Sequence, residues 1–200
     1  MTDIQVLDKA LLFIRESTGV LRPSYDYDIV DPETGQVVLR CRERNMGFFT
    51  KLLRFTDLRQ STPFDFTVTT TEGGTLMRVS RGVPVFSSRL RVVDDEGVAL
   101  GGFALKPFSI SGAFDVLDAT GIPVCSLKGG LTGRRFRFLA PDGIELARVR
   151  KKWAGVGREF FAGASDYVLE IDEAVPPGGT TRRLILASVL CIGMVLKVQT

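Results

Sequence analysis

The residues of this chain best suited to chemistry are basic side chains that recur on alternate positions of two neighbouring segments. Alternation places side chains on one face of an extended strand, and guanidinium groups bind phosphate oxygens in a bidentate geometry. From Lys128 to Lys152 there are eight basic residues against two acidic ones. The pattern predicts an anion-binding face whose phosphate partners are Arg135, Arg137, Arg148, Arg150 and Lys152.

Two other interpretations of this basic face are open. Outward positions on strands often carry charge only for solubility, and the net charge of +3 is too small to decide. Nucleic acid would attract the same side chains. No recognition-helix, zinc-finger or RNP-type signature accompanies them, so we expect no sequence-specific nucleic-acid binding. One anionic surface that would suit this face is the acidic leaflet of a membrane, to which each basic side chain contributes about 1 kcal/mol. The alternative is a soluble adaptor or regulator that uses the face to bind protein or nucleic acid.

The sequence contains no recognisable set of catalytic residues. The chain contains no histidine, which excludes Ser-His-Asp and Cys-His nucleophile systems and HExxH zinc sites. The three cysteines are far apart and form no CxxC motif. We expect buried thiols in a reducing compartment, and neither catalytic residues nor a metal site of cysteine or histidine ligands.

A short segment, Gly47 to Phe55, interleaves aromatic and basic residues. Such an element could dip into the headgroup region of a membrane, or it could fold back as a cover over the rest of the domain. The candidates for membrane contact are Phe48, Phe49, Lys51 and Arg54.

The elements that must position these residues are β-hairpins. Apolar residues alternate on either side of five turn segments, and the strands recur every 20 to 30 residues, which gives about eleven or twelve strands. This spacing is also compatible with a propeller or solenoid. For the first residues, Asp3 to Glu16, the pattern fits a helix or a strand. The turns are expected at Asp31–Gly35, Glu72–Gly74, Asp94–Gly97, Asp118–Gly121 and Pro141–Gly143.

The C-terminal region contains an unbroken apolar run, Leu184 to Leu196. These thirteen residues are fewer than the roughly 20 needed to span a bilayer, and apolar residues on every face favour a helix enclosed by protein. A single-span anchor is the rival interpretation. A closed barrel of about twelve strands leaves an interior that must be filled, because empty apolar space is costly, and this helix would fill it.

We therefore predict a mainly β fold, a closed antiparallel barrel of about twelve strands around a buried hydrophobic C-terminal helix. The whole chain, 1–200, forms one domain. It is divided into a lead-in at 1–20, the barrel at 24–175 and the central helix at 181–197.

The segment Ala147 to Ile171 carries a family resemblance. It resembles the phospholipid scramblase family, in which a G-x-I-x-K-x-W-x-G-x-x-x-E-x-F-x-x-A-D segment precedes an apolar helix. The stretches Glu16–Gly19, Tyr27–Gly35 and Thr62–Phe64 are also similar to family motifs. The residues that fall on the main pattern are Val149, Lys151, Trp153, Gly155, Glu159, Phe161 and Ala164.

The resemblance implies the tubby-like fold of the superfamily that also includes LURP-one-related proteins. It also implies membrane association at the cytoplasmic face, binding of anionic phospholipid or phosphoinositide, and movement of phospholipid between leaflets, with calcium as a stimulus. A barrel filled by its own helix offers headgroups no polar path, so lipid binding is easier to reconcile with this fold than lipid transport.

The sequence departs from the family where calcium would bind. Gly163 and Ser165 stand in place of the first acidic residues, and calcium needs about six to eight oxygen ligands. The weak candidates that are left are Asp166, Asp172 and Glu173, and we expect no tight calcium site and no other cofactor.

The expected location is cytoplasmic, with peripheral and reversible attachment to the inner face of the membrane. The N-terminal residues have no basic region ahead of an apolar signal segment, which argues against secretion. The cysteine-rich palmitoylation stretch of the family is replaced here by Val85 to Ser88, and stable anchoring normally needs two membrane signals. We expect a monomer, with a protein partner as an open alternative.

Overall fold

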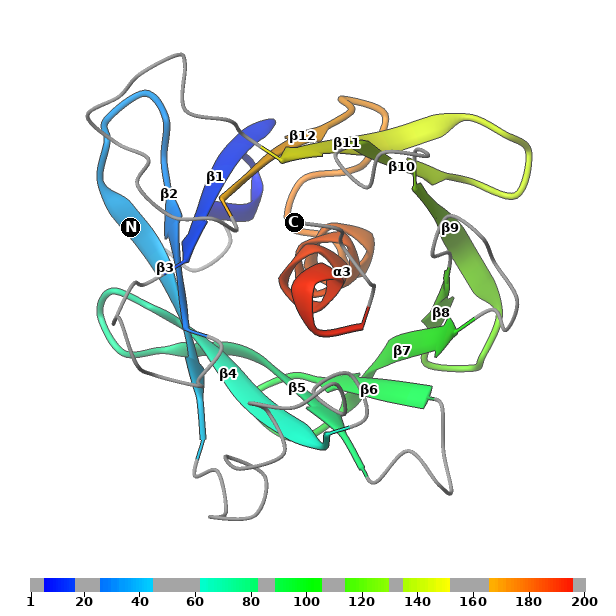
Figure 1. Cartoon of the computed structure of the whole chain (residues 1–200), viewed down its shortest axis with the longest axis horizontal. Coiled ribbons are helices and arrows are strands. Elements are labelled where there is room, and N and C mark those ends of the chain that lie inside the picture. The colour runs from blue at the N-terminus through cyan, green and yellow to red at the C-terminus, as the bar shows by residue number, and fades with distance from the viewer. Residues whose placement is uncertain are drawn as a thin grey trace.

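The computed structural model of the chain describes residues 6–16, 26–44, 62–82, 89–105, 114–129, 135–151 and 166–195. Within these ranges the chain forms strands that are followed by one long helix (Figure 1). The strands are β1 Leu11–Glu16, β2 Tyr27–Val30, β3 Val37–Glu43, β4 Phe64–Thr70, β5 Thr75–Arg81, β6 Arg89–Val93, β7 Ala99–Leu105, β8 Phe114–Asp118, β9 Pro123–Gly129, β10 Arg135–Leu139, β11 Glu145–Lys151 and β12 Tyr167–Ile171. The helix is α3, Thr180–Val195.

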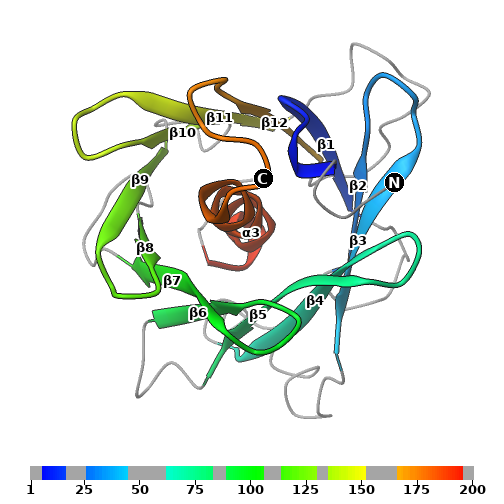
Figure 2. The ribbon, with the colours of Figure 1, turned by 180° about the vertical axis from the view of Figure 1, so that it is seen from behind.

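The twelve strands close into a single antiparallel barrel. Each strand pairs with its neighbours in sequence, and β12 returns to pair with β1, where Leu12 lies opposite Leu169. Closure pairs the two edges that an open sheet would leave exposed. Figures 1 and 2 show the barrel from its two ends, with α3 at its centre. A propeller or a solenoid is therefore excluded.

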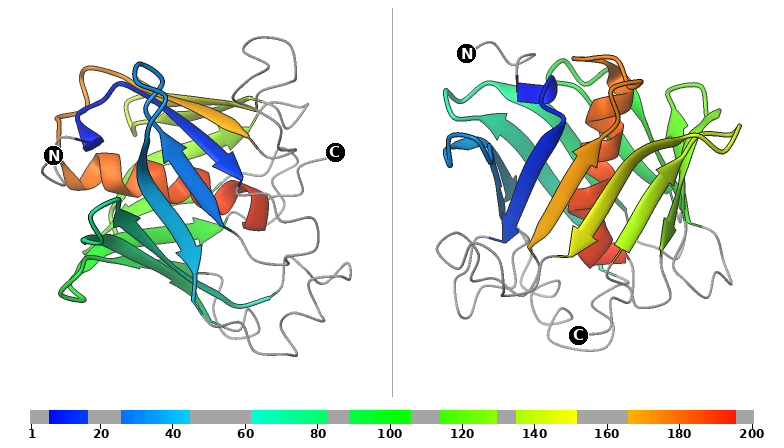
Figure 3. Two further views of the ribbon diagram at one scale, coloured as in Figure 1. Left: turned by 90° about the vertical axis from the view of Figure 1, so that its left-hand side faces the viewer. Right: turned by 90° about the horizontal axis from the view of Figure 1, so that it is seen from above.

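The five tight hairpin turns lie at the same end of the barrel, because each one follows an even-numbered strand of an antiparallel series (Figure 3). All five are at the positions expected from the sequence. In each of them a glycine has positive φ, for example Gly97 at 85° and Gly121 at 88°, a conformation that other residues adopt only with strain. The helix starts at this turn end and runs toward the opposite end (Figure 3, right).

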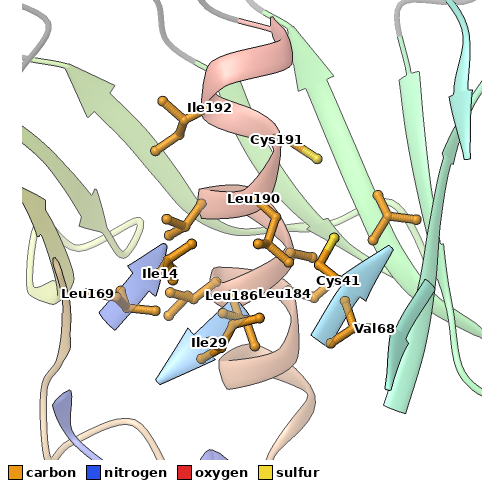
Figure 4. Close-up of a cluster of buried hydrophobic side chains, with 14 of the residues drawn as sticks. Ile14, Ile29, Cys41, Val68, Leu169, Leu184, Leu186, Leu190, Cys191 and Ile192 are labelled. Atoms are coloured by element: carbon orange, nitrogen blue, oxygen red, sulfur yellow. The ribbon is translucent and has the colours of Figure 1, made fainter. Parts of the chain in front are cut away.

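Alternation along the strands separates the interior from the surface. On β4 the side chains of Phe64, Phe66 and Val68 are buried, whereas the intervening residues are partly exposed. The inward side chains of β1, β2, β3, β4 and β12 point toward α3, among them Ile14 and Leu169 (Figure 4).

The middle of the helix, from Leu184 to Ile192, is buried on all sides, as its unbroken apolar sequence requires. From Leu184 to Ile192 every side chain is at most 1% exposed. The one polar residue in that stretch, Ser188, donates its hydroxyl to the carbonyl of Leu184 at 2.7 Å. Within the described residues, no helix is long and apolar enough to cross a membrane.

A buried arginine fastens the first turn of α3 to the wall of the barrel. Arg182 is 3% exposed, and its guanidinium donates to the carbonyls of Val175, Leu7 and Lys9 at 3.0, 2.9 and 3.1 Å. Burial lowers the pKa of this guanidinium from its ordinary value. The three carbonyls come from the segment before β1 and from the connection between β12 and α3, so one side chain joins both ends of the described chain.

One detail differs from the sequence analysis. The barrel begins at Leu11 and not near residue 24, because β1 lies inside the expected lead-in of residues 1–20. The apolar spacing of Ile4, Leu7, Leu11 and Ile14 resembles a helix, but the strand uses only Leu12 and Ile14 as fully buried positions. The helix itself agrees with the expected 181–197 within two residues. The three cysteines are free and buried, as expected.

Candidate functional site

The outer wall of β9, β10, β11 and β12 brings the predicted basic residues together. In the β10–β11 pair, Arg135 lies opposite Arg150 and Arg137 lies opposite Arg148. All four side chains belong to the exposed positions of their strands. Two directly opposed pairs of arginines therefore stand side by side on the surface of the barrel, and the first predicted feature of the site, a shared basic face, is present.

The register extends this basic face across two more strands. Lys128 of β9 lies opposite Arg137, and Glu170 of β12 lies opposite Arg148. One row across the sheet thus reads Lys128, Arg137, Arg148, Glu170. We call the set of Lys128, Arg135, Arg137, Arg148 and Arg150 the basic face.

Two carboxylates contact the basic face. Glu145 accepts a hydrogen bond from Nε of Arg148 at 2.8 Å, and its other oxygen lies 3.8 Å from Nη1 of Arg137. Glu170 pairs with Nη2 of Arg150, and its second oxygen lies 3.8 Å from Nε of Arg148. The hydrogen bond that Arg148 donates to Glu145 raises the pKa of its guanidinium above the ordinary value.

Within the described part of the chain, the remaining two cations differ from these three. Among the described residues, neither Lys128 nor Arg135 has a carboxylate within ion-pair distance. The side chains of Arg137, Arg148 and Arg150 are 62%, 56% and 54% exposed. All of these cations are therefore accessible to a ligand from solvent.

A shallow concavity of about 550 Å³ lies within the basic face. Its lining combines the five basic residues with Gly129, Phe136, Val149 and Glu145. Like charges directly opposite each other on a sheet destabilise it, and five cations against two carboxylates leave an excess of positive charge. This arrangement is suited to bind an anion with several oxygens, such as a phosphate group. The described residues that line the concavity include no nucleophile with a neighbouring general base.

Some predicted residues lie outside the described part of the chain. Lys152 is one of them, and so is Trp153. The aromatic and basic residues proposed for membrane contact, Phe48, Phe49, Lys51 and Arg54, are also outside it. Their roles stay predictions.

The three calcium candidates are divided between the two ends of β12. Asp166 precedes the strand and is buried, where its carboxylate accepts a hydrogen bond from the amide of Glu16 at 3.1 Å. Asp172 and Glu173 follow the strand, and Asp172 accepts a hydrogen bond from the amide of Ala174 at 2.9 Å. Six residues of extended chain span about 20 Å, so Asp166 cannot share one ion with the other two. Within the described ranges, no group of three or more metal-ligating side chains is placed to hold a metal ion.

The sequence analysis did not select Lys128, Glu145 or Glu170. Alternation back from Arg137 across the β9–β10 hairpin could have identified Lys128. Glu145 was harder to predict, because the register of β10 and β11 shifts between Phe138 and Leu139. A bulge of this kind changes which face later residues occupy. Glu170 is brought to Arg148 only by the pairing of β11 with β12.

Comparisons with known proteins agree with this architecture. A family model described as Scramblase matches residues 22–196. A protein from Arabidopsis thaliana, known from an X-ray structure, superimposes with a TM-score of 0.59 at 13% sequence identity, over 96% of each chain. At this identity the likeness concerns the fold alone. A search of curated proteins gave no match.

Proposed function

Because the chain belongs to the scramblase family, we propose that it binds anionic phospholipid surfaces through the basic face of β9, β10 and β11. The observation that carries this proposal is the pairing of Arg135 with Arg150 and of Arg137 with Arg148 on an exposed sheet. Phosphate oxygens between opposed guanidinium groups would relieve the repulsion and form bidentate hydrogen bonds. Lys152, which follows Arg148 and Arg150 at the same spacing in the sequence, is proposed as a further phosphate partner.

The expected strength is modest and reversible. Each basic side chain near an acidic leaflet contributes about 1 kcal/mol, and the basic face has three more cations than it has neighbouring carboxylates. Such binding falls steeply with salt, because exposed charges are screened over about 8 Å at physiological ionic strength. Electrostatics of this size favours recruitment to the acidic cytoplasmic leaflet over permanent anchoring.

Binding is a better account of this structure than lipid transport. The barrel interior is filled by α3, whose eight apolar side chains between Leu184 and Ile192 are buried. Withdrawing the helix would expose them at a cost on the order of 10 kcal/mol or more. We therefore propose that the barrel with its helix in place recognises lipid without moving it, and that scrambling by this chain would require a different conformation.

The experiment that tests this proposal is co-sedimentation of the purified protein with vesicles. Neutral phosphatidylcholine vesicles are compared with vesicles that contain an anionic lipid, each with and without calcium. The variant Arg148→Glu/Arg150→Glu reverses two charges of the basic face. The matched control Arg40→Glu/Arg91→Glu reverses two exposed arginines of β3 and β6 and changes the net charge equally.

We expect wild type and control to sediment with anionic vesicles, the basic-face variant to stay in solution, and calcium to have no effect. Equal binding of both variants would contradict a localised site. Absence of binding in all conditions would refute lipid recognition and favour a soluble adaptor. Steep salt dependence with no preference for lipid over other polyanions would point the same way.

A further inference from the structure

The turn end of the barrel carries apolar side chains that the proposed lipid surface does not use. Within the described ranges, the large apolar residues that are exposed are Val98, Ile122 and Ile144, at 57%, 63% and 55%. We propose that these three residues, which we call the aliphatic rim, form a docking surface for a protein partner that presents basic and aliphatic side chains together. The basic face lies on the outer wall of β9, β10 and β11, so this inference concerns a different surface and does not rest on lipid binding.

The three residues occupy one repeated position in three consecutive hairpins. Each directly follows the glycine of positive φ in the turn between β6 and β7, β8 and β9, or β10 and β11. These hairpins follow one another around the barrel (Figure 2). Adjacent strands are about 4.8 Å apart, so neighbouring hairpins leave the wall roughly 10 Å apart. Single exposed apolar residues are ordinary, but a row at this spacing is within reach of one interface of about 800 Å² per partner.

The backbone of each rim residue is held at both its amide and its carbonyl. Each amide donates to an aspartate carboxylate of the same turn, and each carbonyl accepts from the amide four residues earlier. The amide hydrogen bonds measure 2.7, 2.9 and 3.1 Å, to Asp94, Asp118 and Asp142 respectively. Side chains on such a fixed backbone lose little freedom when they are buried by a partner, which reduces the entropic cost of an interface.

The turns themselves do not require an aliphatic residue at this position. In the β2–β3 hairpin the residue after the glycine is Gln36, and its carbonyl accepts from the amide of Asp31 at 2.9 Å in the same way. A polar side chain therefore closes a turn of this kind. Aliphatic side chains in the other three turns expose apolar surface to water, which is unfavourable until another molecule covers it.

Acidic residues around the aliphatic rim indicate the charge of the partner. The segments 94–98, 118–122 and 140–144 contain five acidic residues and no lysine or arginine, although basic residues outnumber acidic ones by three in the whole chain. Three of the five are the aspartates that bind the turn amides, whereas Asp95 and Glu96 are exposed and take no part in those bonds through their side chains. Like charge across an interface is costly and opposite charge steers association. An acidic leaflet or a nucleic acid would be repelled here, whereas a segment with lysine or arginine beside its aliphatic residues would be attracted.

Peptide selection tests this docking surface without assuming a natural partner. A phage-displayed library of random peptides is panned against the full-length protein, and enriched peptides are synthesised and titrated by fluorescence anisotropy. The docking variant Val98→Ser/Ile122→Ser/Ile144→Ser removes the aliphatic rim. The control Gln36→Ser changes the equivalent position of the β2–β3 turn, and circular dichroism establishes that both are folded.

A second pair of variants tests the role of charge. Asp95→Asn/Glu96→Gln removes two exposed carboxylates beside the aliphatic rim. The control Glu33→Gln/Glu72→Gln removes two exposed carboxylates from the turns that carry no exposed aliphatic residue. The two variants change the net charge equally.

We expect the enriched peptides to combine lysine or arginine with aliphatic residues. The docking variant should bind them at least about tenfold more weakly than wild type, as loss of central apolar contacts does in other interfaces. Asp95→Asn/Glu96→Gln should weaken binding about fivefold at low salt, and both controls should stay within about twofold of wild type. Absence of enrichment, enrichment of acidic peptides alone, or equal binding of peptides to wild type and docking variant would overturn the proposal.

Two further measurements on the docking variant exclude other occupants of the aliphatic rim. Binding to anionic vesicles should equal that of wild type, and a loss would assign the aliphatic rim to the bilayer and overturn the protein partner while leaving lipid recognition intact. Sedimentation equilibrium should give the same mass for both proteins. Self-association of wild type that the docking variant lacks would assign the aliphatic rim to a second copy of the chain and also overturn the proposal.

Discussion

The two faces of β10 and β11 contrast sharply, although they are made by neighbouring residues. Inward, Phe136, Phe138 and Val149 are at most 2% exposed and pack around α3. Outward, the arginines next to them in sequence lie opposite each other across the strands, and three of them, Arg137, Arg148 and Arg150, are more than half exposed. The inner side chains are enclosed by other apolar groups, whereas the outer face has an excess of positive charge.

The fold and the proposed binding therefore depend on different side chains of the same strands. Burial of apolar surface sets the stability of the barrel, and it depends little on which polar residues lie outside. Charge on the outer face adds at most about 1 kcal/mol per exposed ion pair to stability. Substitutions on the inner face should therefore change stability, and substitutions on the outer face should change binding.

The largest effect should come from an inward residue of β10. Phe138→Ala removes a fully buried ring and should lower the free energy of unfolding by about 3–5 kcal/mol. Its neighbour Arg137→Ala should change that free energy by less than about 1 kcal/mol. Urea denaturation of both variants measures the difference, and effects of similar size would contradict the idea that stability depends mainly on the inner face.

A somewhat smaller loss is expected at the start of the helix. Arg182→Met keeps most of the side-chain volume but leaves the carbonyls of Val175, Leu7 and Lys9 without their donor. Unmade hydrogen bonds to buried groups cost about 1–3 kcal/mol, so we expect a destabilisation of roughly 3 kcal/mol. Arg183→Met, one residue on, is the control. The melting temperatures of the two variants provide the measurement. Equal values would contradict the role assigned to Arg182.

The reactivity of the three cysteine thiols tests whether the interior of the barrel is closed. Burial raises the pKa of the Cys125 thiol to about 12 and raises those of Cys41 and Cys191 as well. A raised pKa leaves less thiolate at a given pH, and the thiolate is the reactive form. At pH 8 the folded protein should react with iodoacetamide at least about a hundredfold more slowly than the urea-unfolded chain. Mass spectrometry counts the modified thiols, and rapid labelling of any of the three in the folded protein would contradict a closed core.

The smallest expected effect concerns single outer arginines. Arg150→Ala should weaken binding to anionic vesicles about fivefold, equivalent to about 1 kcal/mol, and should leave the free energy of unfolding nearly unchanged. Arg91→Ala, on the opposite wall, should alter neither quantity. A vesicle titration of the two variants at several salt concentrations provides the measurement. A similar loss in both would mean that only net charge matters.

Much of the fold could be predicted from the sequence, because burial leaves a strong pattern. Alternation of apolar residues marked the strands, the glycine-containing turns marked the hairpins, and an apolar run too short for a bilayer marked the enclosed helix. β1 was harder to assign. Only Leu12 and Ile14 of that strand are fully buried, and the apolar residues around them follow a spacing that also fits a helix.

The candidate site could be predicted only in part. The alternating arginines identified β10 and β11, since a strand and its hairpin partner are close in sequence. Glu170 comes from β12, which pairs with β11 through the closed topology, and Glu145 reaches Arg148 beside a shift in register. Neither partnership follows from spacing along the chain. The sequence therefore predicted the cations of the basic face but not the carboxylates that pair with them.

Vesicle binding and the free energy of unfolding, measured on one variant, show whether binding and fold depend on different faces. In this variant the four arginines of the basic face become glutamine: Arg135→Gln, Arg137→Gln, Arg148→Gln and Arg150→Gln. Loss of the exposed ion pairs should be offset by relief of the opposed like charges. We predict that binding to anionic vesicles is lost while the free energy of unfolding stays within about 1 kcal/mol of wild type. Wild-type affinity for vesicles, or a barrel that no longer folds, would contradict the division of fold and binding between the two faces.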